Sequence, residues 1–124
     1  MADDVIPDDV RDFILRHIDS VAQLEALLLL RANGSQDWDV ARTAARLYTG
    51  EEEIRKVLAQ LCADGLLSCR ENIYHYECPP DVRATVDRLA EVYRRHLIPV
   101  TNIIHTKPRR IREFADAFKF RKDT

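Results

Sequence analysis

The sequence predicts a mainly α-helical fold with one small β-hairpin and a C-terminal helical arm. Apolar side chains recur at helical spacing through most of the chain, which is the main signal of amphipathic helices. Each of the three glycines, Gly34, Gly50 and Gly65, stands at the end of such a segment or between two of them. One stretch, "LLSCRENIYHYEC" at residues 66–78, instead combines a turn with β-forming side chains and predicts a hairpin.

Two helices are expected in the first third of the chain. Residues 7–18, "PDDVRDFILRHI", start with proline and acidic side chains and place apolar residues on one face, as a short amphipathic helix does. Ser20 and Gln23 then form a capping box, which begins a second helix. This second helix is expected to lie at the centre of the core. Its apolar residues are Val21, Leu24, Leu27, Leu28, Leu29 and Leu30.

A third and a fourth helix follow, with a tight turn between them. Asp39 precedes "VARTAARL" as the N-cap of the third helix. Leu47 and Tyr48 are expected to anchor the turn, and Thr49 with Glu52 to form a second capping box. The buried stripe of the fourth helix is expected to be Ile54, Leu58 and Leu61, with Asp64–Gly65 ending it.

The chain after the hairpin predicts a helical arm, set apart by Pro79–Pro80. Residues 1–78 are expected to form one domain, and residues 79–124 an arm for dimerisation or partner binding. Pro99 bends or restarts the first helix of the arm, and Pro108 lies in the first turn of a last helix. Apolar residues at helical spacing are left over in this arm, which predicts a homodimer. The expected contact residues are Val82, Val86, Leu89, Tyr93, Leu97, Ile111, Phe114 and Phe118.

Composition limits the class of protein. A hydrophobic fraction of 46% with a charged fraction of 32% is typical of a folded, soluble chain and excludes a disordered one. The longest apolar run, Ala26–Leu30, is far shorter than the roughly 20 residues that span a bilayer. The acidic N-terminus lacks the basic and then apolar pattern of a signal peptide. The expectation is a cytoplasmic protein that does not enter a membrane.

No motif points to an enzyme, a metal or a cofactor. There is no phosphate-binding glycine loop, no GxSxG and no HExxH, and the four histidines are scattered among the expected elements. Three cysteines without CxxC spacing indicate free thiols in a reducing compartment. A metal site from Cys69, His75 and Cys78 would lack a fourth ligand. Trp38 is expected to lie in the core or to cover it.

The net charge of −2 hides an uneven distribution along the chain. Residues 1–67 carry 7 basic and 13 acidic side chains, whereas residues 68–124 carry 12 basic and 8 acidic ones. Within the second half, residues 107–122 hold 7 basic and 2 acidic side chains, so an anionic partner is expected to meet the C-terminal end. The alternative is a solvated face of an amphipathic helix whose apolar side packs in a dimer.

The stretches "WDVARTAARLYTGEEEIRKVLAQLCADGLLS" and "YHYE" resemble the winged helix-turn-helix superfamily, found in bacterial transcriptional regulators of the MarR, ArsR and PadR kinds. A helix of small residues precedes the turn, and the next helix ends in a leucine, a charged residue, a glycine and an apolar pair. The resemblance covers residues 20–78 and is specific to the superfamily only. It implies a dimeric DNA-binding regulator of bacterial transcription. The helices after the hairpin resemble the dimerisation arm of PadR-like or MarR-like proteins.

In this resemblance the fourth expected helix is the one that enters the major groove of DNA, and the hairpin is the wing. Arg55 and Lys56 suit phosphate or guanine contacts, and Gln60 could read a base. Residues 51–53 are all glutamates and oppose this role, because a carboxylate near phosphate weakens binding. The expected binding residues are Glu52, Glu53, Arg55, Lys56, Ala59, Gln60, Arg70, Arg109, Arg110 and Arg112.

Two functions therefore stay open. The first is a dimeric regulator that binds double-stranded DNA. The second is a winged-helix module that binds a regulatory protein, such as a sigma factor, a kinase or another regulator, and does not bind DNA. The basic C-terminal segment favours the first function, and the acidic start of the fourth helix favours the second.

Overall fold

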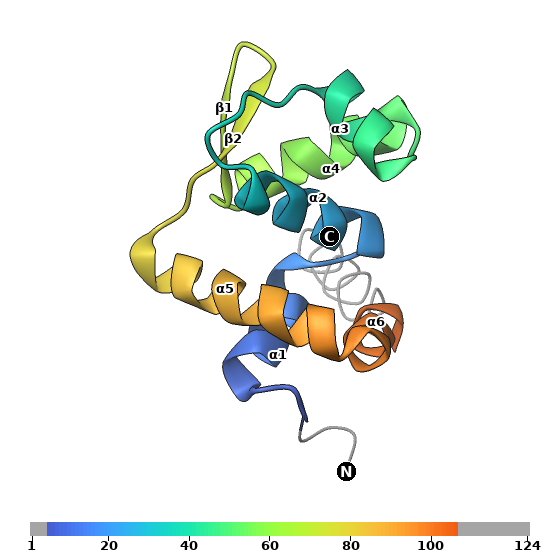
Figure 1. Ribbon diagram of the computed structural model, residues 1–124, viewed down its shortest axis with the longest axis vertical. Coiled ribbons are helices and arrows are strands. Elements are labelled where there is room, and N and C mark those ends of the chain that lie inside the picture. The colour runs from blue at the N-terminus through green and yellow to red at the C-terminus, as the bar shows by residue number, and fades with distance from the viewer. Residues whose placement is uncertain (1–4, 107–124) are drawn as a thin grey trace, which may run out of the picture.

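The computed structural model describes residues 5–106 and shows a mainly α-helical chain with one two-stranded antiparallel hairpin (Figure 1). The predicted combination of helices and a hairpin is confirmed in this range. The expected last helix and its residues Arg109, Arg110, Ile111, Arg112, Phe114 and Phe118 lie outside the described residues. The elements in order are α1 (Asp8–His17), α2 (Val21–Ala32), α3 (Val40–Leu47), α4 (Glu51–Ala63), β1 (Leu67–Arg70), β2 (Ile73–Tyr76), α5 (Pro80–Arg95) and α6 (Leu97–Thr106).

Helix α2 lies at the centre of the fold, between two groups of elements (Figure 1). Helices α3 and α4 and the hairpin lie on one side of it, and α5 lies on the other side together with α1 and α6. Leu24, Leu27 and Leu30 of α2 have no exposed surface, and neither do Ile54 and Leu58 of α4. The prediction that α2 is the central core helix is confirmed.

The side chains of Ser20 and Gln23 hold the start of α2. Ser20 Oγ accepts a hydrogen bond from the backbone N–H of Gln23 at 3.1 Å, which satisfies a donor of the first helical turn. The amide oxygen of Gln23 accepts from the N–H of Asp19 at 2.8 Å, and its amide nitrogen donates to the carbonyl of His17 at 2.7 Å. The Ser20 half of the predicted capping box is confirmed, whereas the Gln23 side chain bonds Asp19 and His17 and not the N–H of Ser20. These bonds fix the corner between α1 and α2.

Trp38 joins the hairpin to the segment before α3. The backbone N–H of Trp38 donates to the carbonyl of Tyr74 at 3.3 Å, and the backbone carbonyl of Trp38 accepts from the N–H of Tyr74 at 2.7 Å. Trp38 therefore forms an isolated β-bridge beside β2. The indole is fully buried, and its Nε1 donates to the carbonyl of Asn33 at 3.3 Å. The guanidinium carbons of Arg42 and Arg46 lie 4.8 and 5.7 Å from the ring centroid. Of the two places expected for Trp38, in the core or covering it, the structure shows the core.

Polar contacts connect helix α5 to α1 and to α2. The Nε of Arg88 donates to the carboxylate of Asp9 in α1 at 2.7 Å. The hydroxyl of Tyr93 donates to the carboxylate of Glu25 in α2 at 3.1 Å. Helix α1 also packs on α5 and α6, so the first helix of the chain and the arm lie together. The division into two domains at residue 78 stays a prediction.

The five described residues that were expected to form a dimer interface differ in how deeply they are buried. Val86 and Leu89 have no exposed surface and belong to the core of the single chain. Packing within the protomer therefore accounts for these two residues without a second copy. Val82 and Tyr93 are half-buried against the same core, whereas Leu97 is 49% exposed at the start of α6. A dimer stays a prediction, and of these five residues Leu97 offers it the most apolar surface.

Candidate interaction surface

Helix α4 has one buried face and one exposed face. Ile54, Leu58 and Leu61 point into the core with no exposed surface, as the sequence predicted. With 3.6 residues per turn, burial of this stripe turns the side chains between its members outward. The outward face carries all six residues of this helix that the sequence assigned to a partner, namely Glu52, Glu53, Arg55, Lys56, Ala59 and Gln60.

Helix α4 begins one residue later than a Thr49 cap requires. Gly50 is the N-cap, and no side chain makes a capping hydrogen bond there. The hydroxyl of Thr49 instead donates to the carbonyl of Leu47 at 3.1 Å. The predicted capping box of Thr49 with Glu52 is wrong, because the hydroxyl turns back toward α3. The carboxylate of Glu52 lies 3.1 Å from the guanidinium of Arg55.

The outward face of α4 is acidic at its start. Glu51, Glu52 and Glu53 are all exposed in the first turn, where negative charge complements the helix dipole. A phosphate that approached the same turn would be repelled. Over residues 5–106 the chain carries 12 basic and 16 acidic side chains, a net charge of −4. The described part of the chain therefore favours cationic groups over anionic ones.

The two arginines of the neighbouring helix α3 are engaged within the chain. Arg42 lies over the ring of Trp38, donates to the carbonyl of Asp37 at 3.1 Å and donates to the side-chain oxygen of Gln36 at 2.6 Å. Arg46 lies over the same ring. A phosphate group would have to compete with these contacts to bind either arginine.

Tyr48, in the turn between α3 and α4, is 96% exposed, more than any other large hydrophobic side chain in residues 5–106. Its backbone is left-handed, with φ 54° and ψ 41°, a conformation that costs a bulky L-residue about 1–2 kcal/mol. The prediction that Leu47 and Tyr48 together anchor the turn is wrong for Tyr48, and only the half-buried Leu47 packs on the core. Helical spacing could not place Tyr48, because this residue leaves the helix at its C-cap.

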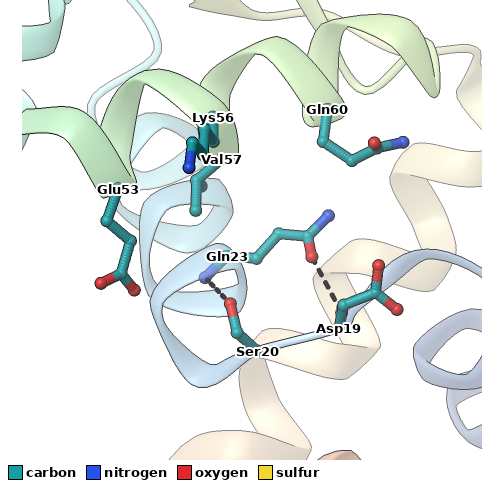
Figure 2. A pocket seen from close by; sticks show the side chains of 7 residues that line it. All are labelled: Asp19, Ser20, Gln23, Glu53, Lys56, Val57 and Gln60. Carbon is teal, nitrogen blue, oxygen red and sulfur yellow. Dashed lines mark hydrogen bonds between the residues drawn. The ribbon is translucent and has the colours of Figure 1, made fainter. Parts of the chain in front are cut away.

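An open groove lies between α4 and the start of α2 (Figure 2). Its volume is about 450 Å³. Figure 2 shows Glu53, Lys56, Val57 and Gln60 along α4, and Asp19, Ser20 and Gln23 on the opposite side. Charges of both signs line the groove, whereas its two amides are engaged within the chain, Gln23 with Asp19 and His17 and Gln60 with Asp64. The lining of the groove by itself selects no class of partner.

The hairpin offers one arginine to a partner. β1 and β2 pair in antiparallel register, with Arg70 opposite Ile73. Glu71 and Asn72 form the connecting turn with φ of 53° and 67°, and the turn that the sequence predicted there is confirmed. Arg70 is exposed at the end of β1, directly before the acidic Glu71. The hairpin therefore adds little positive charge next to the outward face of α4.

Within residues 5–106, no three histidine, cysteine, aspartate or glutamate side chains are grouped as metal ligands would be. None of the described helices is both long enough and apolar enough to cross a bilayer. Comparison of the chain with protein-family models, with curated proteins and with solved structures found no match. The geometry, the charge and the order of the elements therefore carry the functional proposal.

Proposed function

We propose that this chain is a winged-helix regulatory module that binds a protein partner through the α3–α4 turn and the outward face of α4. The order of α2, α3, turn, α4 and hairpin agrees with the winged helix-turn-helix that the sequence resembles, which supports this assignment. The observation that carries the proposal is the exposed ring of Tyr48, which in the chain precedes a run of three exposed glutamates by three residues.

A fully exposed tyrosine next to carboxylates suits a protein surface. Tyrosine is among the residues that contribute most to protein interfaces, because its ring covers a large area with few rotatable bonds. Backbone strain of the kind found at Tyr48 concentrates at binding sites. Glu51 and Glu53 would pair with lysine or arginine side chains of the partner, and Glu52 would exchange its contact with Arg55 for one of them. The partner is therefore expected to present an apolar pocket with a basic rim.

A DNA-binding regulator, acting as a dimer, is the second candidate. Arg55, Lys56 and Gln60 are exposed on one face of α4, and Arg70 is exposed in the hairpin. In this alternative α4 enters the major groove, where arginine and lysine bind guanine or phosphate. The three glutamates of the first turn would then lie close to the DNA backbone, which is why this function ranks second.

A salt titration with a random-sequence DNA duplex separates the two functions. A protein-binding module is expected to show no measurable binding even at low salt, whereas a DNA-binding regulator loses affinity steeply as salt rises. Arg55→Glu combined with Lys56→Glu should abolish any DNA binding that occurs through α4. Arg16→Glu combined with Arg83→Glu is the control, because it changes the net charge equally at exposed positions in α1 and α5. Salt-sensitive binding that only the α4 variant loses would replace the proposal with the second candidate.

Site-specific photo-crosslinking tests the protein partner directly. A photoreactive residue at position 48 is expected to capture one partner in the cells that contain this chain, and the same residue at Ala84 of α5 is expected to capture none. Replacing residues 51–53 with lysine should remove that crosslink. With the purified partner, Tyr48→Ala should weaken affinity about 30-fold or more, as at an interface hot spot, and Tyr48→Phe much less. Equal capture at positions 48 and 84 would contradict the proposal.

A further inference from the structure

Two of the three cysteines lie where α4 meets the hairpin. Cys62 is half-buried in the last turn of α4, and Cys69 is exposed in β1. The third cysteine, Cys78, is buried after β2, where its neighbour is Tyr76. Neither Cys62 nor Cys69 belongs to the proposed binding surface.

The chain between Cys62 and Cys69 is a tightly bonded corner. The N–H of Gly65 donates to the carbonyl of Cys62 at 3.0 Å, and the N–H of Leu66 donates to the carbonyl of Leu61 at 3.0 Å. Gly65 has a φ of 79°, so the two bonds form a Schellman motif, which sets the direction of β1 relative to α4. These backbone hydrogen bonds therefore fix where the two cysteines lie relative to each other along the corner.

Cys69 lies on the same side of the hairpin as two buried residues, while its own side chain is exposed. Leu67, two residues earlier in the strand, and Tyr74, directly opposite Cys69, are both buried. Cys62 lies across the corner from Cys69, because β1 packs against α4 and Cys62 belongs to the last turn of that helix. Burial, with the Cys69 thiol as the next cause, raises the pKa of Cys62 to about 12. Burial and then the Cys69 thiol also raise the pKa of Tyr74. Two thiols and one phenol therefore form a single cluster.

We infer that Cys62 and Cys69 are a redox modification site, which forms a reversible intramolecular disulfide when the protein meets a hydroperoxide. The exposed Cys69 thiolate attacks one peroxide oxygen and breaks the O–O bond. The other oxygen leaves as water after taking the proton that Cys69 released, and Cys69 becomes a sulfenic acid. The sulfur of Cys62 then displaces the sulfenic hydroxide, and the proton of Cys62 completes a second water as the S–S bond forms. Two thiols are oxidised while one hydrogen peroxide molecule is reduced to two water molecules.

The disulfide would tie the last turn of α4 to β1. Tyr74, opposite Cys69 in the hairpin, makes both backbone hydrogen bonds to Trp38. The ring of Trp38 in turn lies under Arg42 of α3. Oxidation therefore acts at the point where α4, the hairpin and the segment before α3 meet. Trp38 is the single tryptophan of the chain, so its fluorescence reports whether the disulfide has formed.

The test oxidises the full chain with hydrogen peroxide, alkylates the remaining thiols under denaturing conditions and maps the products by mass spectrometry. The expected product has lost two hydrogens, links the peptides that contain Cys62 and Cys69, and leaves Cys78 alkylated. Dithiothreitol should restore both the original mass and the original Trp38 fluorescence. This mapping uses the wild-type chain, so its outcome does not depend on whether a variant folds.

Serine variants separate the roles of the two thiols. Cys62→Ser should accumulate a sulfenic acid at Cys69 that dimedone traps, whereas Cys69→Ser should leave Cys62 unreacted over the same time. Cys78→Ser is the control and should form the disulfide as the wild type does. A product linked between two chains through Cys69 would overturn the inference. Oxidation of Cys69 to the sulfinic acid while Cys62 stays a free thiol would overturn it as well.

Discussion

The two corners at the ends of α4 use the same left-handed backbone with different residues. At the C-terminal corner the residue is Gly65, with φ 79°, which has no Cβ to clash with the backbone. At the N-terminal corner it is Tyr48, with φ 54°, whose ring is 96% exposed. Glycine lowers the free energy of the first corner, whereas tyrosine raises that of the second. The contrast supports a folding role for residue 65 and a binding role for residue 48.

The largest expected difference comes from placing serine at each of the two glycines that flank α4. Gly65→Ser puts a Cβ on left-handed backbone and should lower the free energy of unfolding by about 1–2 kcal/mol. Gly50→Ser is the matched control, because Gly50 has a φ of −62° and open space around it, and serine is a preferred N-cap. Urea unfolding of both variants measures the difference. Equal destabilisation at the two positions would show that the left-handed backbone is not the cause.

A smaller effect of opposite sign is expected at the other corner. Tyr48→Gly should raise the free energy of unfolding by about 0.5–1 kcal/mol, since the strain relieved, about 1–2 kcal/mol, exceeds the entropic disadvantage of glycine. Tyr48→Phe keeps the strain and should leave the stability unchanged. The same urea experiment measures both variants. A loss of stability in Tyr48→Gly would mean that the ring contributes to folding, which would contradict the contrast between the corners.

A pH-dependent effect is expected beside the C-terminal corner, where alkaline pH acts through Cys62. Burial, with the Cys69 thiol as the next cause, raises the pKa of Cys62 from 9.0 to about 12. Between these two pH values the unfolded chain loses this proton while the folded chain keeps it, so the free energy of unfolding falls as pH rises. Well below pH 9.0 both states are protonated and this group contributes no pH dependence.

Urea unfolding at a series of pH values checks the alkaline prediction. Cys62→Ser should make the fall in stability shallower than in the wild type. Tyr93 acts in the same direction, because burial and the Glu25 carboxylate raise its pKa to about 12, so part of the fall should remain in this variant. An identical pH dependence in Cys62→Ser and the wild type would show that the thiol does not differ between the folded and unfolded states.

Short-range patterns were enough to predict most of the backbone. The Ser20 cap, the turn at Glu71–Asn72 and the buried stripe of α4 each depend on residues a few positions apart, and all three are present. Two wrong predictions fall at one corner, where Thr49 does not cap α4 and Tyr48 does not pack. Their cause is the left-handed end of α3, which changes the direction of the chain in a way that helical spacing does not encode.

Residue spacing and capping indicated the helices α1 to α5 and the face of α4 that is buried, because these signals act within a single element. The candidate binding residues of α4 could be chosen for the same reason, whereas the exposed ring of Tyr48 could not. Packing between elements settled the rest. It buried Val86 and Leu89 in the core of the chain itself, joined Trp38 to Tyr74 and brought β1 against the end of α4. Such contacts depend on how whole elements meet in space, so no short stretch of sequence contains them.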